Sequence, residues 1–98
     1  MAVLTPKQIK ASFNTATNWS QRTTTIGRTY HFDGFMSSIA FVNHVADDAQ
    51  KINHHPEINI KFNQVTLTLT TQGEGGITEK DFALARQCDE VFLRYFAS

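Results

Sequence analysis

The stretch KINHHPEINIKFNQVTLTLTT, Lys51 to Thr71, decides the fold. Every second side chain is apolar in residues 58–62 and again in residues 65–69, and the side chains between them are Asn, Lys and Thr. This period of two is typical of strands with one buried face. Because only Asn63 and Gln64 separate the two runs, the sequence predicts a hairpin and therefore an antiparallel sheet.

A long amphipathic helix is predicted just before this hairpin, in residues 35–53. At about 100° per residue its apolar side chains gather in one broad arc, and polar side chains occupy the rest of the helix surface. A helix with such an arc is expected to pack over the sheet. The arc comprises Phe35, Ile39, Phe41, Val42, Val45, Ala46, Ala49 and Ile52.

Further elements are predicted towards the N-terminus. Thr5, Pro6 and Gln8 match a helix start with a capping box, and this short helix is expected to end before Trp19. In residues 26–32 the apolar side chains of Ile26, Tyr30 and Phe32 share one parity, while Thr29 and His31 take the other. A strand is therefore predicted there.

The C-terminal part is predicted to form a glycine-rich loop at 73–76 and a last helix. Thr78 and Asp81 have the spacing of a second capping box, so Asp81 is predicted to cap this helix. The element order becomes helix-strand-helix-strand-strand-helix. The predicted fold class is α+β, an antiparallel sheet with helices packed on one face. The length of 98 residues suits a single domain over residues 1–98.

The composition argues against several classes of function. Lys plus Arg equal Asp plus Glu at nine each, so no basic surface is available for direct binding to nucleic acid. The single cysteine, Cys88, can form no internal disulfide and is predicted to be a core residue. No apolar run approaches the about 20 residues that span a bilayer, and the N-terminus lacks the pattern of a signal peptide. The expected protein is soluble and intracellular.

The polar face of the predicted hairpin has two interpretations. Antiparallel sheets commonly leave one face in water. The same face could instead be a docking surface between subunits. Its side chains are Asn59, Lys61, Thr66, Thr68 and Thr70.

Two adjacent histidines, His54 and His55, precede Pro56 at the end of the long helix. A residue before proline is driven out of the helical region, so His55 cannot continue the helix and His54 is expected at or beside its last turn. The negative end of the helix dipole favours a protonated imidazole, so these rings could act as general acids in a small-molecule pocket. The alternative is a structural cap in which a histidine only binds the last carbonyl groups.

A metal site is the second alternative for the histidine pair. Adjacent helical residues point about 100° apart and rarely bind one ion. His31 and His44 are predicted elsewhere, on a strand and on the polar face of the helix. With one cysteine and no HxxxH spacing, the sequence predicts no metal site.

Three runs of the chain resemble the pterin-4a-carbinolamine dehydratase family. They are KINHHPE at 51–57, VTLTLTT at 65–71 and GGITEKDFALA at 75–85. Trp19 and the Tyr30–Phe32 strand also fit, so the resemblance covers nearly the whole chain.

The resemblance implies an enzyme that dehydrates a 4a-hydroxytetrahydropterin to the quinonoid dihydropterin, a step in the recycling of tetrahydrobiopterin. It implies a small-molecule pterin substrate, no metal and no bound cofactor. It also implies a homotetramer or homodimer in the cytoplasm. Animal members of the family bind a homeodomain transcription factor as coactivators, which implies a transcription-factor partner and a nuclear pool as an alternative.

The resemblance also implies roles for individual residues. His54 and His55 are implied as the catalytic acid and base groups. Asp81 matches the aspartate at which the family pattern ends, yet a structural cap remains its predicted role. The implied substrate-binding residues are Asn53, Pro56, Thr70, Thr71, Gln72 and Gln50.

Three positions depart from the family pattern. Gln50 replaces an acidic residue, Gln72 replaces a third histidine and Ile58 replaces a tryptophan. Gln72 can donate or accept a hydrogen bond, but an amide cannot shuttle a proton. Two hypotheses follow: a functioning dehydratase that relies on His54 and His55, or a low-activity or inactive member that binds pterin or acts as a partner module.

Overall fold

The computed structural model describes residues 3–97. These residues form three α-helices, two short 3-10 helices and four strands. No helix in this part of the chain is long and apolar enough to cross a membrane. In chain order the elements are α1 (Pro6–Ser12), η1 (Phe13–Thr15), β1 (Ser20–Arg22), β2 (Thr25–His31), α2 (Phe35–Ile52), β3 (Glu57–Lys61), β4 (Gln64–Leu69), η2 (Gln72–Glu74) and α3 (Glu79–Tyr95).

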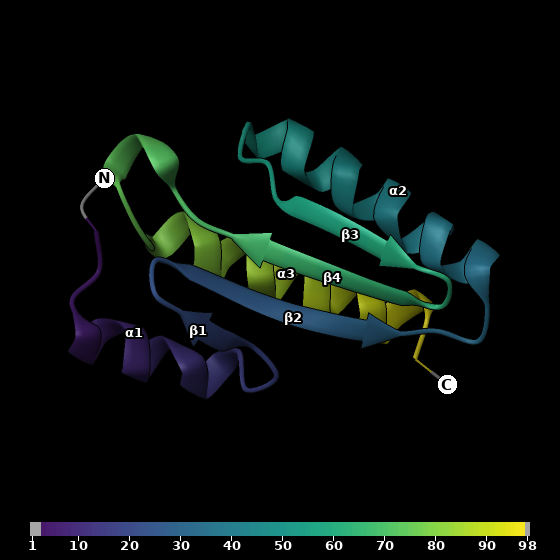
Figure 1. Ribbon diagram of the computed structural model, residues 1–98, viewed down its shortest axis with the longest axis horizontal. Helices are drawn as coiled ribbons and strands as arrows, with labels where there is room; N and C mark the ends of the chain where they lie inside the picture. Colours follow the sequence, from purple (N-terminus) through teal and green to yellow (C-terminus); the bar gives the residue numbers. More distant parts are fainter. Residues whose placement is uncertain (1–2, 98) are drawn as a thin grey trace.

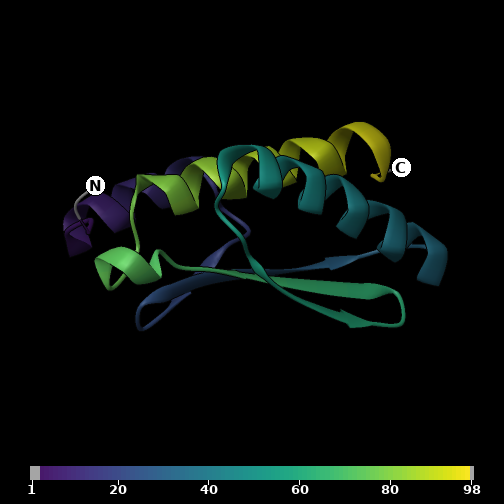
Figure 2. The same ribbon diagram turned by 90° about the horizontal axis from the view of Figure 1, so that it is seen from above.

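The fold has two layers. A four-stranded sheet with the order β1-β2-β4-β3 forms one layer, and every neighbouring pair of strands is antiparallel. The helices lie together over one face of the sheet (Figures 1 and 2). The predicted α+β class, with helices on one face of an antiparallel sheet, is confirmed.

The predicted hairpin is present as β3 and β4, but its turn lies one residue earlier than expected. Lys61 pairs with Gln64, so Phe62 and Asn63 form the turn. Phe62 has a φ of 53°, in the left-handed region that a bulky residue rarely adopts. A two-residue hairpin turn needs a positive φ so that it matches the twist of its strands. The alternation of side chains carries no information on φ, so it could not show which two residues form the turn.

The sequence did not predict β1, which forms a second hairpin with β2. Ser20 pairs with Gly27, and Arg22 pairs with Thr25. All three residues of β1 are exposed, so this short polar strand at the sheet edge has no alternation to detect. Its turn is also tight, with a φ of 54° at Thr23. The sheet therefore has one strand more than predicted.

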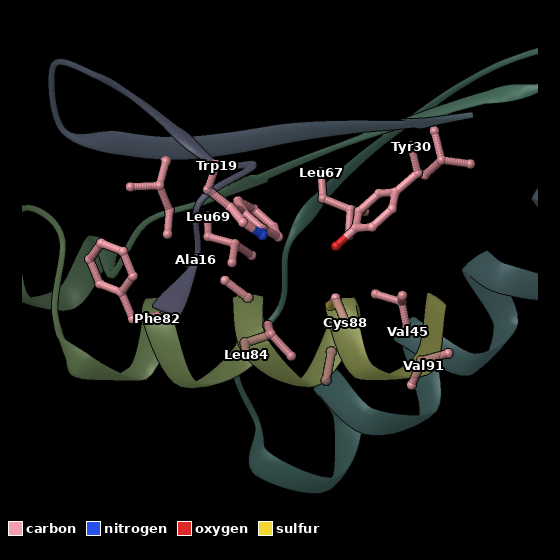
Figure 3. Packing of buried hydrophobic residues seen from close by; sticks show 14 of the residues in the cluster. Ala16, Trp19, Tyr30, Val45, Leu67, Leu69, Phe82, Leu84, Cys88 and Val91 are labelled. Atoms are coloured by element: carbon pink, nitrogen blue, oxygen red, sulfur yellow. The ribbon is translucent and has the colours of Figure 1, made fainter. Parts of the chain in front are cut away.

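The core lies between the sheet and the helices, as Figure 3 shows. Inward side chains of β2 and β4 meet side chains of α2 and α3 there. Cys88 is 1% exposed, which confirms its place in the core. Burial raises the pKa of its thiol to about 12. The core includes Trp19, Ile26, Tyr30, Phe41, Val45, Ala49, Val65, Leu67, Leu69, Phe82, Leu84, Ala85 and Cys88.

The apolar arc predicted for α2 is only partly buried. Phe35 and Ile52, the first and last residues of the helix, are 48% and 51% exposed, and Ala46 is also exposed. Buried positions recur three and four residues apart, so α2 contacts the core along a narrower stripe than predicted. This stripe consists of Ser38, Phe41, Val45 and Ala49.

A largely buried polar cluster centred on Asp89 joins β2 to α3. One carboxylate oxygen of Asp89 accepts hydrogen bonds from Arg28 Nη1 at 2.6 Å and from the Tyr30 hydroxyl. Trp19 Nε1 donates to the same carboxylate at 3.0 Å. Burial, together with the hydrogen bond to Asp89, raises the pKa of Tyr30. These bonds hold the segment before β1, the middle of β2 and α3 against one another.

Candidate functional site

A cavity of about 860 Å³ opens where α2 ends, β3 begins and β4 ends. Its size falls within the range of small-molecule sites, about 300–1,000 Å³. The lining contains every predicted site residue except Gln50 and Asp81. These residues are Asn53, His54, His55, Pro56, Thr70, Thr71 and Gln72.

The turn after α2 places the histidine pair. Asn53 follows the helix with a φ of 53°, a left-handed conformation that asparagine adopts more readily than most residues. The N–H of His54 donates to the carbonyl oxygen of Ala49 at 3.0 Å, which closes the last turn. Pro56 then directs the chain into β3. Both histidines therefore lie beyond the end of the helix, in agreement with the prediction from the proline.

His54 is buried beside the first turn of α3. Its Nε2 lies 2.6 Å from Oδ1 of Asp81, whose side chain is completely buried. A carboxylate only accepts hydrogen bonds, so Nε2 carries a proton in this contact. In a neutral ring that leaves Nδ1 without a proton and able to accept one.

Asp81 also caps α3 and binds a threonine pair. Its Oδ2 accepts hydrogen bonds from the Thr78 N–H and from the Thr71 hydroxyl, each at 2.9 Å. The two threonine hydroxyl oxygens lie 2.8 Å apart. Because Thr71 donates its single proton to Asp81, Thr78 must donate to Thr71. Asp81 thus has the contacts of a cap, and it also holds His54, which the capping-box spacing did not indicate.

His55 is exposed on the cavity wall, and its side chain is hydrogen-bonded to a residue of α2. Its Nε2 lies 2.9 Å from Oε1 of Gln50. An amide oxygen only accepts hydrogen bonds, so this ring also carries a proton on Nε2. Gln50 is absent from the lining of the cavity. The structure therefore places Gln50 against a histidine and not in the wall where a substrate would bind.

Another part of the cavity lining is formed by the end of β4 and the loop after it. Thr70 donates its hydroxyl proton to the carbonyl oxygen of Thr24 at 2.7 Å, and Thr71 donates to Asp81. Neither hydroxyl keeps a proton to donate to a ligand. Gln72 is exposed, and its amide makes no hydrogen bond within residues 3–97. Its side chain is therefore available to a ligand.

Five polar side chains of the cavity were not among the predicted site residues. One of them, Thr68, was predicted only as part of the polar face of the hairpin. Thr24 lies in the turn between β1 and β2, which gave no sequence signal, and Thr25 is the first residue of β2, just before the predicted strand. Glu57 and Lys80 also line the cavity. Two sequence features could have pointed to these residues as part of the site. Glu57 directly follows Pro56, and Lys80 lies within the capping box of α3.

The cavity carries the kinds of side chain that proton transfer on a polar ligand requires. The cavity presents two imidazoles, an unengaged amide and one charge of each sign, on Glu57 and Lys80. Within residues 3–97, no three or more His, Cys, Asp or Glu side chains gather in a way that could hold a metal ion.

Comparison with known sequences points to one family. The family model described as Pterin 4 alpha carbinolamine dehydratase matches residues 2–91. A protein of Chloroflexus aurantiacus is 50% identical over 74 residues, which are 76% of this chain and 80% of that protein. A protein of Herpetosiphon aurantiacus is 40% identical over 92 residues, 94% of this chain and 96% of that protein. Both carry the name pterin-4-alpha-carbinolamine dehydratase as a provisional assignment.

Solved structures agree with this result. The transcriptional coactivator/pterin dehydratase of Brucella melitensis has a TM-score of 0.87 at 30% identity, over 91% of this chain and 97% of that chain. A pterin dehydratase-like protein identified as a RuBisCO assembly factor in the alpha-carboxysome has a TM-score of 0.61 at 22% identity, over 74% of this chain and 84% of that chain. The second likeness is one of fold alone. With its family match extending over residues 2–91, this chain belongs to the pterin-4a-carbinolamine dehydratase family.

Proposed function

We propose that this protein dehydrates a 4a-hydroxytetrahydropterin to the quinonoid dihydropterin, as a step in the recycling of tetrahydrobiopterin. Family membership supplies the class of reaction. One observation carries the proposal: His54 and His55 line the same cavity, and each Nε2 is bonded to a protein acceptor.

The reaction removes water across two bonded atoms of the pterin. The C4a–O bond breaks, the hydroxyl leaves as water after gaining a proton, and N5 loses its proton as the N5=C4a double bond forms. One group must protonate the hydroxyl and another must accept the proton of N5. Two imidazoles meet both needs, because an imidazole can act as an acid or a base near neutral pH.

The partners of the two rings suggest which ring does which step. Asp81 can pair with a positively charged His54 across 2.6 Å, whereas Gln50 offers His55 only a neutral oxygen. We therefore assign protonation of the leaving hydroxyl to His54 and removal of the N5 proton to His55. Nδ1 is the reacting atom in both rings, since Nε2 is engaged in each.

The remaining walls of the cavity would hold the flat pterin ring. Gln72 would offer its amide as donor and acceptor to the polar edge of the heterocycle. Asn53 and Pro56 border the histidines in the chain, and Thr70 and Thr71 line the same cavity. Gln50 contributes indirectly, by holding His55.

A stopped-flow absorbance assay of 4a-hydroxytetrahydropterin loss tests the proposal. The wild-type chain should accelerate the loss, and His54→Ala or His55→Ala should each slow turnover by about 10²- to 10⁴-fold where proton transfer limits the rate. His31→Ala is the matched control, because His31 is an exposed histidine outside the cavity. Wild-type turnover no faster than the uncatalysed reaction would count against a dehydratase.

Gln72→His tests whether the departure from the family pattern costs activity. The imidazole would add a third group able to exchange protons at the rim of the cavity. A sharp rise in turnover would show that Gln72 represents a catalytic loss, and an unchanged rate would show that His54 and His55 suffice.

We also propose that the chain forms a homodimer or homotetramer. Several large apolar side chains are exposed, at levels that a partner surface would explain. They are Phe35 at 48%, Met36 at 71%, Phe62 at 67% and Leu93 at 70%. Light scattering after gel filtration would measure the mass of the assembly, and a monomer at micromolar concentration would contradict this assignment.

A second candidate function is that of a partner-binding module. The structural relative from Brucella melitensis is described as a transcriptional coactivator as well as a pterin dehydratase. Gln50 and Gln72 replace groups of the family pattern that can exchange protons, which fits a chain with reduced catalysis. If His54→Ala with His55→Ala left every phenotype of the cell unchanged while deletion of the gene did not, the partner role would be favoured.

A further inference from the structure

A second hollow lies on the open face of the sheet and borders the site cavity. Its volume is about 480 Å³. Thr25, Glu57 and Thr68 line both hollows. The two hollows are therefore neighbours, and together they are called the trough here. The second hollow lies on the face of the sheet away from α3, which is turned to the viewer in Figure 1.

The floor of the trough is shaped by small side chains. Gly27 lies in the middle of β2, where it pairs with Ser20 of β1 and Thr68 of β4. A Cβ atom at Gly27 would lie 3.2 Å from the carbonyl oxygen of Leu67, so a larger residue would have to displace the backbone. The missing side chain leaves the sheet hollowed here, with hydroxyl-bearing residues on either side.

Arg22 supplies a positive charge at the outer end of the trough. It lines the second hollow but not the first, and its guanidinium makes no ion pair or hydrogen bond within residues 3–97. Arg28 also lines this hollow, but its charge is engaged by Asp89 at 2.6 Å. Among the described residues that line the trough, Glu57 is the one with a carboxylate. It lines both hollows, whereas Lys80 lines the site cavity alone. Arg22 is therefore the positive charge of the second hollow that no described carboxylate engages.

We propose that the trough binds the C6 substituent of a reduced pterin, and that Arg22 strengthens the binding of substituents that end in an anion, a carboxylate or a phosphate. This inference rests on the proposed function. C6 of the pterin is bonded directly to N5, one of the two atoms on which the histidines act. The substituent therefore leaves the ring beside the histidine pair.

The chain itself connects the histidines to the outer hollow. His55, Pro56 and Glu57 are consecutive and all line the site cavity, and Glu57 is one of the residues shared with the outer hollow. A substituent that follows this wall passes Thr68 and Thr25 and reaches Arg22. A guanidinium with no partner among residues 3–97 is well suited to carboxylates and phosphates, because its donors match two oxygen atoms at once.

Isothermal titration calorimetry with three ligands tests the inference. 7,8-Dihydrobiopterin has a neutral substituent, 7,8-dihydrofolate ends in carboxylates and 7,8-dihydroneopterin triphosphate ends in phosphates. Each ligand is titrated into the wild-type chain, Arg22→Gln and Lys61→Gln. Lys61→Gln is the matched control, because it removes one positive charge from the sheet without touching the trough.

Arg22→Gln should raise the Kd of an anionic ligand about fivefold at low ionic strength and leave the Kd of 7,8-dihydrobiopterin unchanged. Lys61→Gln should leave all three values unchanged. The anionic ligand whose Kd rises more in Arg22→Gln identifies whether Arg22 prefers a carboxylate or a phosphate. Equal losses in both variants, or no loss for either anion, would overturn the inference but not the proposed function. A wild-type chain that binds none of the three ligands would overturn both.

Discussion

His54 Nε2 and Asp81 Oδ1 lie 2.6 Å apart, so the first histidine after α2 is hydrogen-bonded to the acidic residue of the capping box of α3. The two residues are 27 positions apart in the chain, and both are buried. Through this bond the capping box of α3 also fixes the orientation and the tautomer of a ring in the candidate site. A change at Asp81 should therefore affect the stability of the fold and the chemistry together.

Asp81→Asn should lower both stability and turnover. Asparagine keeps the size of the side chain, but it loses the charge and one acceptor that serve Thr78, Thr71 and His54. We expect the free energy of unfolding to fall by about 1 kcal/mol, as for other lost caps, and turnover to fall by about 10²-fold or more. Urea unfolding and the stopped-flow assay measure the two effects.

Thr5→Ala is the matched control for Asp81→Asn. Thr5 caps α1 through a capping box with Gln8, and neither residue lines the cavity. This variant should also lose about 1 kcal/mol of stability, but turnover by the folded protein should not change. If Asp81→Asn lost only stability in the same way, Asp81 would be a structural cap and nothing more.

Gln50→Leu should disturb His55 and leave His54 unchanged. It removes the oxygen that accepts the Nε2 proton of His55 at 2.9 Å, so the ring is no longer held in one tautomer. We expect turnover to fall by about tenfold, the effect of one hydrogen bond. Nitrogen-15 NMR of the imidazoles should show the change at His55 alone.

Gln50→Glu distinguishes the effect of losing the hydrogen bond to His55 from the effect of changing the shape of the side chain. Glutamate restores an acceptor at the same length, so the tautomer of His55 and the turnover lost in Gln50→Leu should return. Identical nitrogen-15 shifts for His55 in the wild type and Gln50→Leu would show that Gln50 does not position the ring.

The regular part of the fold could be predicted from local patterns in the sequence. Alternation at 58–62 and 65–69 predicted two strands, and Thr78 with Asp81 predicted the start of α3, because these signals lie within a few residues of one another. β1 could not be predicted in this way. β1 is short, polar and exposed, and it is a strand because its backbone pairs with the edge of β2.

Without the family resemblance, the candidate site was predictable only where the chain itself changes direction. Pro56 located the histidine pair, since a residue before proline leaves the helix. The bond between His54 and Asp81 and the bond between Thr70 and Thr24 join segments that meet only after folding. No spacing in the sequence encodes such contacts.

The buried thiol of Cys88 should make the protein less stable at alkaline pH. Its pKa is raised from 9.0 to about 12 by burial, so the unfolded chain loses this proton first. The stabilisation is fully present below the unfolded value and is lost as the pH rises towards 12. Within this window the free energy of unfolding should fall by about 1.4 kcal/mol per pH unit for this group.

Cys88→Ala isolates this contribution. The variant should lose some stability at neutral pH, because a core side chain becomes smaller, but its stability should depend less on pH above about 9. Urea unfolding at a series of pH values measures the slope for both proteins. Equal slopes, or rapid labelling of the native thiol by a disulfide reagent at pH 8, would contradict the burial argument.

Arg28 shares the inward parity of Ile26 and Tyr30 on β2, and the alternation pattern gives no reason for a charge on that face. Asp89 of α3 supplies the reason, because it accepts hydrogen bonds from Arg28, Tyr30 and Trp19. Asp89→Ala should leave these donors without their acceptor in a site where the Arg28 and Asp89 side chains are only 15% and 18% exposed. We expect a loss of about 2–4 kcal/mol in the free energy of unfolding.

Glu90→Ala is the matched control at the next position of α3. Glu90 pairs with Arg94 at 3.1 Å, but both side chains are 62% exposed, so the loss should stay below about 0.5 kcal/mol. Urea unfolding measures the loss in the free energy of unfolding for both variants. The comparison shows whether the contribution of a charged residue depends on its burial or only on its having an ionic partner. Similar losses in the two variants would mean that the Asp89 cluster is no stronger than a surface pair. A large loss in Asp89→Ala alone would identify the cluster as the link that holds β2 and the Trp19 segment to α3.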